Sequence, residues 1–170
     1  MNYTKVLVIK KETFLAAAQF TVLLAVATLA PLLGHQQFLT GPIVNSTLFI
    51  STMLLGSSSA ILVGLIPSLI ALSCGLLPAV LAPMVPFIMM GNTILVLVFG
   101  YSRKKNYWLG MVSASFLKFA FLAGTSSLVI DLLLKKEVAR NVALMMSWPQ
   151  LFTALAGGII AYLFLKSIKR

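Results

Sequence analysis

The residues from Thr13 to Ser102 include no aspartate, glutamate, lysine or arginine. Ninety consecutive residues without a charged side chain can hardly fold in water without aggregating. Since one membrane-spanning helix needs only about 20 apolar residues, this stretch must contain several spans. The whole chain is 60% hydrophobic and 9% charged, which lies outside the usual range for a soluble domain. We therefore predict an all-α integral membrane protein.

The basic residues lie at the ends of the apolar segments, so they predict the topology. The net charge of +10 would suggest nucleic-acid binding in a soluble protein, but that reading does not fit charges placed at segment ends. The positive-inside rule places the three main basic groups, and with them both termini, in the cytoplasm. These groups are Lys5, Lys10 and Lys11; Arg103, Lys104 and Lys105; and Lys166, Lys169 and Arg170. A smaller basic group then lies outside, which partly disagrees with the positive-inside rule: Lys135, Lys136 and Arg140.

Helix-breaking residues divide the apolar sequence into six predicted spans. The run from Ile43 to Cys74 would make a helix about 48 Å long, which is too long for one span, and Gly56 and the serines after it interrupt the run. Gly41 and Pro42 predict an outer loop at residues 35–45, and three prolines predict an irregular segment at residues 75–86 that covers the outer end. We predict a single membrane domain, residues 1–170, with transmembrane helices at about residues 13–33, 43–56, 58–74, 87–101, 107–134 and 147–166.

The first apolar segment has two interpretations. Ala25, Val26 and Ala27 resemble a signal-peptide cleavage site. We favour a retained helix because the apolar run continues past that site and because a retained helix leaves both ends of the chain inside. Ala17, Thr21 and Ala25 repeat at four-residue spacing, which makes a stripe that lets another helix approach closely. Most such stripes are packing faces only.

One lysine, Lys118, lies near the middle of the fifth predicted span. It is eleven residues, or about 16 Å, beyond Tyr107, which is close to the midplane of a hydrocarbon core about 30 Å thick. A charge at that depth costs at least about 2.5 kcal/mol, so it usually faces the protein interior and marks a ligand or ion path. Because the mapped spans offer no carboxylate at similar depth, we predict that Lys118 binds an anionic group of a ligand. The alternative is a neutral Lys118 bonded to a neighbouring helix.

Other polar side chains map to the midplane or outer half of the predicted spans, or to the first outer loop. Each also has a structural explanation: Asn92 can bridge helices, Trp148 can belong to the interfacial aromatic belt, and the loop residues can be solvated. Together they predict an outward-facing pocket for a small polar molecule. The predicted substrate-binding residues are Lys118, Asn92, Trp148, Gln150, Gln36, Gln37, Thr40 and Asn45.

The sequence gives no support for catalysis or metal binding. His35 is the only histidine and Cys74 the only cysteine, so neither residue has a partner for a metal site. No Walker-type loop and no nucleophile with an adjacent base can be found. The spans contain no acidic residue except Asp131 near an outer end, which counts against proton or sodium coupling. We predict no enzymatic activity, no cofactor and no autonomous active transport.

In these features the chain resembles the substrate-binding S components of energy-coupling-factor (ECF) vitamin transporters. The resemblance covers nearly the whole chain: six predicted spans, a basic head, the short GSSSA turn at residues 56–60, a long outer segment before the fourth helix, and basic residues after helices four and six. In that family, alanines four residues apart in the first helix contact a transmembrane T component driven by two ATPases. The matching positions here are Ala17, Thr21 and Ala25, and Thr21 departs from the all-alanine form.

The resemblance implies high-affinity capture of a small water-soluble vitamin or related micronutrient at the outer face of the cell membrane, by the first outer loop and helices four to six. It implies a T component and two ATPase subunits as partners. The alternative function is a structural or assembly subunit of a membrane complex without its own small-molecule ligand. In that alternative, Lys118 pairs with a carboxylate of a partner protein.

Overall fold

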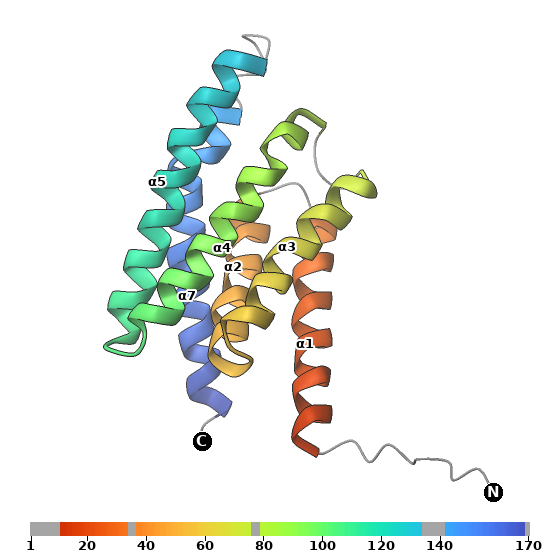
Figure 1. Cartoon of the computed structure of the whole chain (residues 1–170), viewed down its shortest axis with the longest axis vertical. Helices are drawn as coiled ribbons and strands as arrows, with labels where there is room; N and C mark the ends of the chain where they lie inside the picture. Colours follow the sequence, from red (N-terminus) through yellow and green to blue (C-terminus); the bar gives the residue numbers. More distant parts are fainter. Residues whose placement is uncertain (1–10, 34–36, 76–78, 134–141, 169–170) are drawn as a thin grey trace, which may run out of the picture.

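The computed structural model describes residues 11–33, 37–75, 79–133 and 142–168, and every regular element among them is helical (Figure 1). The predicted all-α fold is confirmed, with six α-helices of 17 or more residues in these ranges. In chain order the elements are α1 Lys11–Leu29, the 3-10 helix η1 Ala30–Leu33, α2 Gln37–Leu54, α3 Ser57–Ser73, the 3-10 helix η2 Ala79–Met84, α4 Val85–Ser102, α5 Tyr107–Leu133 and α7 Trp148–Ile168.

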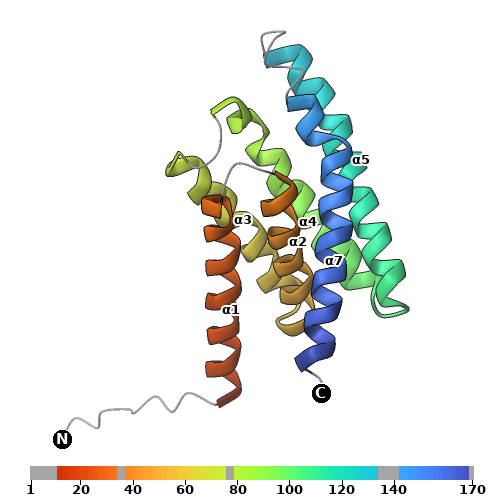
Figure 2. The ribbon, with the colours of Figure 1, turned by 180° about the vertical axis from the view of Figure 1, so that it is seen from behind.

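The helices run alternately up and down, so that α1 begins and α7 ends at the same end of the bundle (Figure 1). We call this the terminal end and the opposite one the far end. Helix α2 lies at the centre and packs against α1, α3, α4 and α7, while α4 packs most extensively on α5. Helix α1 stands at the edge of the bundle (Figure 2), where it contacts α2 and α3.

The main hydrophobic core joins α1, α2, α3, α4, α5 and α7, with α1 contributing Leu23 and Ala27. Phe49 of α2 and Phe99 of α4 are fully buried, and their rings meet edge to face with centroids 4.7 Å apart. Helices α2 and α7 approach closely where Gly157 faces α2. A Cβ atom at Gly157 would lie 2.7 Å from the Cβ of Asn45 and 2.8 Å from the backbone nitrogen of Ser46. This close approach needs glycine, and it sets the position of Asn45.

The predicted outer loop at residues 35–45 is wrong for its described part, because α2 already begins at Gln37 and contains Pro42. Proline in a helix removes one backbone hydrogen bond and crowds the carbonyl four residues earlier. Here Pro42 lies in the second turn of α2, so only the helix start is affected. Packing against α7 covers the same region: a Cβ at Gly41 would lie 2.7 Å from the Cβ of Thr153. Helix packing therefore overrides the Gly-Pro signal.

Within the described residues, four helical stretches are long and apolar enough to cross a membrane, by length and composition: Lys11–Leu32, Ala82–Ser102, Tyr107–Ser127 and Val142–Ile168. Helix α3 is apolar but has only 17 residues. Helix α2 is long enough but buries a run of polar side chains, which are Asn45, Ser46, Thr47, Ser51 and Thr52. The polar side chains of α2 therefore face the interior of the bundle.

Two glycines with positive φ stand at the ends of α3. Gly56 (φ 84°) forms the tight turn from α2 to α3, as the GSSSA sequence predicts, and Gly75 (φ 67°) follows the last turn of α3. Side chains other than glycine are strained in this conformation. In the proline-containing segment after Gly75, residues 79–84 form η2, which contacts α4 and α5. The prediction that this segment is not a regular α-helix is confirmed for these residues.

Candidate functional site: a cavity around Lys118

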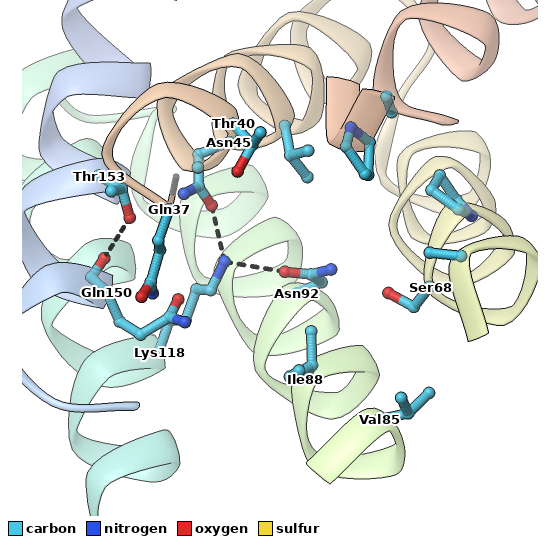
Figure 3. Close-up of a pocket in the computed structure, with 16 residues that line it drawn as sticks. Gln37, Thr40, Asn45, Ser68, Val85, Ile88, Asn92, Lys118, Gln150 and Thr153 are labelled. Atoms are coloured by element: carbon cyan, nitrogen blue, oxygen red, sulfur yellow. Dashed lines mark hydrogen bonds between the residues drawn. The ribbon is translucent and has the colours of Figure 1, made fainter. Parts of the chain in front are cut away.

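A cavity of about 170 Å³ lies between the helices, and all six of them contribute to its wall. The wall consists of the last turns of α1 and α3, the N-terminal halves of α2, α4 and α7, and the middle of α5 (Figure 3). These parts all lie in the far half of the bundle. The lining residues are Ala27, Pro31, Gln37, Thr40, Gly41, Val44, Asn45, Pro67, Ser68, Ala71, Val85, Ile88, Asn92, Lys118, Gln150 and Thr153.

Lys118 is the only charged residue among the described residues that line this cavity. Its side chain is 3% exposed, which confirms the prediction that it faces the interior of the bundle. The Nζ atom donates hydrogen bonds to Oδ1 of Asn45 on α2 at 2.6 Å and to Oδ1 of Asn92 on α4 at 2.8 Å (Figure 3). Both asparagines are buried as well. One lysine of α5 thus connects three helices.

Asn92 is oriented by a further contact on its other side. Its Nδ2 donates to the backbone carbonyl of Gly64 on α3 at 3.0 Å, which turns Oδ1 toward Lys118. The two helices are close here, because a Cβ at Gly64 would lie 3.1 Å from the Cβ of Asn92. Glycine at residue 64 therefore allows the amide of Asn92 to reach the α3 backbone. The polar chain from Gly64 through Asn92 and Lys118 to Asn45 links α3, α4, α5 and α2.

The electrostatics of the cavity favour an anion. Protonated lysine has three N–H donors, and two of them are used here by neutral amide oxygens. No aspartate or glutamate occurs among the lining residues whose side chains the structure describes. A buried cation without a carboxylate partner is costly, and an anionic ligand within reach of Nζ would supply the missing negative charge. The described structure therefore places a buried amino group with hydrogen-bond donors within a mostly apolar wall, and its bonds to α2 and α4 are also the contacts expected of a neutral Lys118 bonded to neighbouring helices.

Polar residues at the α2–α7 side of the cavity hold the start of α7 and the helical stretch 142–146. Gln37 Nε2 donates to the carbonyl of Met145 at 2.8 Å, and Gln150 Nε2 lies 3.4 Å from the same oxygen. The hydroxyl of Thr153 donates to the carbonyl of Gln150 at 3.2 Å. The amide groups of Gln37 and Gln150 belong to flexible side chains, so each could give up its bond to the Met145 carbonyl and bond to a ligand.

The structure brings six of the eight predicted substrate-binding residues to this cavity: Lys118, Asn92, Asn45, Gln37, Thr40 and Gln150. Trp148 does not line it. Its side chain is 62% exposed and stacks on Phe119, with ring centroids 5.5 Å apart, as expected for the interfacial belt that was its alternative explanation. Gln36 lies outside the residues that the structure describes.

Sequence analysis missed two polar residues of the cavity, Ser68 and Thr153. Thr153 follows Gln150 by three residues, so helical spacing puts both on one face and was a usable signal. Ser68 follows Gly64 by four residues, a spacing that is typical of helix-packing faces, so its position gave no sign of a cavity. The apolar walls, such as Val85 and Ile88, carried no signal in a chain this rich in aliphatic residues.

The small-residue stripe of α1 faces away from the bundle. Ala17, Thr21 and Ala25 are all exposed, whereas Leu23 and Ala27 of the same helix are buried against its neighbours. The hydroxyl of Thr21 donates to the carbonyl of Ala17 at 3.0 Å, which satisfies it within the helix. The stripe therefore does not serve as a packing face inside this chain.

A family model described as ECF transporter, substrate-specific component, matches residues 18–168 of the chain. The match includes every described helix except the first turns of α1. No curated protein and no solved structure matches the chain.

Proposed function

The chain belongs to the family of ECF transporter substrate-specific components, and on that premise we propose that it captures a small water-soluble vitamin or related micronutrient at the outer face of the cell membrane. Proteins of this family are substrate-binding subunits of transporters, not enzymes. Uptake then proceeds through an ECF-type ABC transporter that also contains a T component and two ATPase subunits. The substrate binds in the cavity around Lys118.

One observation carries this proposal: a buried lysine, bonded to neutral amides alone, faces a cavity that has room for a small molecule. A charge-assisted hydrogen bond to a ligand carboxylate contributes about 1.5 to 3 kcal/mol, or about one to two orders of magnitude in affinity. The apolar part of the wall suits an apolar body attached to that carboxylate. The substrate we propose is therefore a small molecule with one anionic group.

The buried position of Lys118 also argues against the alternative, an assembly subunit whose lysine pairs with a partner's carboxylate. Such a partner would have to reach a side chain that is 3% exposed and enclosed by α2, α4 and α5. A small molecule can enter the cavity, whereas a side chain on a neighbouring membrane helix would first have to pass between the helices of this bundle.

Uptake experiments test the function itself. Proteoliposomes that contain the chain together with a T component and two ATPases should accumulate a labelled substrate when ATP is supplied. Proteoliposomes with the chain alone should bind but not accumulate it, because the sequence contains neither a nucleotide-binding loop nor an ion-coupling carboxylate near the cavity. Accumulation by the chain alone would refute the proposed division of labour.

The proposed topology places the cavity outside and the terminal end in the cytoplasm. The single natural cysteine, Cys74, is exposed just after α3 at the far end and provides a reporter. A membrane-impermeant maleimide added to intact cells should label Cys74. In a Cys74→Ser background, Ser167→Cys at the end of α7 should react only after the cells are opened. The opposite pattern would invert the topology.

The exposed stripe of α1 is proposed to contact the T component. Because small side chains permit close helix approach, Ala17→Leu or Ala25→Leu should reduce co-purification of the T component by about tenfold, the effect of a steric cost of about 1 to 3 kcal/mol. Substrate binding should be unchanged. Val22→Leu, on an exposed neighbouring face of α1, is the matched control. Loss of substrate binding in the alanine variants, with normal complex formation, would remove the stripe from the partner interface.

A further inference from the structure

A second hollow of about 330 Å³ lies at the terminal end of the bundle, away from the Lys118 cavity. It is lined by Met53 near the end of α2, Tyr107 at the start of α5, and Tyr162, Leu165 and Lys166 in α7. None of these residues contributes to the Lys118 cavity, and the proposed substrate binding does not use them. The walls are apolar and aromatic, with one lysine.

Arg103 lies directly behind one wall of this hollow and lacks a good acceptor. Its Nη1 points at the thioether sulfur of Met53, 2.9 Å away, and its buried Nε has no hydrogen-bond partner among the described residues. Thioether sulfur is a weak acceptor, and no carboxylate of the described structure bonds to this guanidinium. Buried polar groups normally have a hydrogen-bond partner, so the guanidinium of Arg103 has an N–H donor that is free to bond to an added acceptor.

Aromatic residues indicate that this hollow lies at the level of the membrane interface. The rings of Tyr107, Trp108 and Tyr162 contact one another, with centroid distances of 4.8 to 5.8 Å. Tyrosine and tryptophan gather at the headgroup level of membranes, and α4 ends at Ser102, immediately before Arg103. The Tyr107 hydroxyl donates to the carbonyl of Gly158, whereas that of Tyr162 makes no hydrogen bond within the described part of the chain.

We propose that this hollow binds the phosphate group of an anionic phospholipid from the leaflet at the terminal end. The phosphate replaces the Met53 thioether as the partner of Arg103, and the unbranched methionine side chain can turn aside to admit it. Lys166, which is exposed at the rim, and the Tyr162 hydroxyl complete the donor set. Met53 and Leu165 then contact the apolar part of the lipid.

Two features distinguish this site from the general attraction between basic residues and anionic lipid. Lys104 and Lys105, in the same turn as Arg103, are exposed and act only through the diffuse surface potential. Arg103 instead has a buried donor beside a hollow, and a guanidinium binds phosphate oxygens through paired N–H groups. A lipid is favoured over a soluble anion because the hollow has apolar walls and lies at the membrane interface.

Native mass spectrometry of the purified, delipidated chain tests the site. Phosphatidylglycerol and phosphatidylcholine with identical acyl chains are titrated separately, and the fraction of protein with one bound lipid is measured. The wild type should bind phosphatidylglycerol about tenfold more tightly, because phosphatidylcholine carries the same phosphate together with a trimethylammonium group that Arg103 and Lys166 repel. Arg103→Gln should lose this preference, and Lys104→Gln, the matched control in the same turn, should keep it.

A second variant keeps the test valid if Arg103→Gln does not fold. Tyr162→Phe removes only a hydroxyl that bonds to nothing described in the chain, so it should fold normally and weaken phosphatidylglycerol binding about threefold. Equal binding of both lipids by the wild type would overturn the proposal, and so would equal losses in Arg103→Gln and Lys104→Gln. Displacement of phosphatidylglycerol by millimolar inorganic phosphate would show a site for free anions instead of lipid.

Discussion

Replacing Lys118 by methionine is expected to weaken binding of the substrate by about 10- to 100-fold, because the variant loses a charge-assisted hydrogen bond of about 1.5 to 3 kcal/mol. Methionine keeps the length and apolar stem of lysine and adds no polar group to the interior. The measurement compares the fraction of wild-type and variant chains that retain a small molecule after gentle purification, by native mass spectrometry. Substrate affinity that is unchanged would remove Lys118 from the site.

The same variant also changes the protein without its ligand, and a control must separate the two effects. Without the lysine, Oδ1 of Asn45 and Oδ1 of Asn92 lose their donor in a buried place, at a cost of about 1 to 3 kcal/mol for each group left unsatisfied. We expect a lower melting temperature in detergent but a folded chain. Ser113→Ala, elsewhere on α5 with a hydroxyl bonded only within its own helix, should change neither property.

Replacing Asn45 by aspartate should weaken binding of an anionic substrate by about three orders of magnitude. Aspartate has the shape of asparagine, so its carboxylate takes the place of an oxygen that lies 2.6 Å from Nζ of Lys118. The internal ion pair then supplies the negative charge that we assign to the ligand. A ligand carboxylate would also be repelled, and two like charges about 4 Å apart interact by about 4 kcal/mol at an effective dielectric constant of about 20.

The sign of this effect identifies the charge of the ligand. A cationic substrate would bind more tightly to Asn45→Asp, and a neutral one would bind about equally well to both proteins, so either result would contradict an anionic substrate. Asn106→Asp is the matched control, because it makes the same chemical change at the terminal end of α5. There Oδ1 accepts hydrogen bonds from the backbone nitrogens of Trp108 and Leu109, and aspartate can replace asparagine as this cap.

Most helix positions could be predicted from the turn-forming and basic residues that interrupt the apolar sequence. The Gly56 turn, the long apolar sequence of α5 and the end of α4 before Arg103 are all local features, and the structure has them at those places. The start of α2 is different. Gly41 and Pro42 predict a loop by local rules, but the contact of Gly41 with Thr153, more than a hundred residues away, keeps this segment helical. A contact between residues so far apart in the chain cannot be predicted from the residues around Gly41 alone.

The depth and the inward direction of Lys118 were predictable, but the direction of other site residues was not. Counting residues along the predicted spans placed Lys118 near the midplane, Asn92 about two turns below the outer end of its helix, and Asn45 at the end of the predicted outer loop. The direction in which a side chain points usually follows from the contrast between apolar and polar faces, and here the helices are apolar all round. The sequence therefore left Trp148 open between a ligand contact and the interfacial belt, and the structure shows it exposed and stacked on Phe119. Which amides meet the lysine depends on the packing of four helices.

The central claim, that the cavity holds a small anionic molecule on Lys118, is tested most directly by identifying what the protein carries. The chain is purified gently and denatured, and the released small molecules are analysed by tandem mass spectrometry beside the same preparation of Lys118→Met. We predict one compound with a carboxylate or another anionic group, about equal in amount to the wild-type chain and strongly depleted in the variant. A released compound without any anionic group, or equal amounts from both proteins, would contradict the claim.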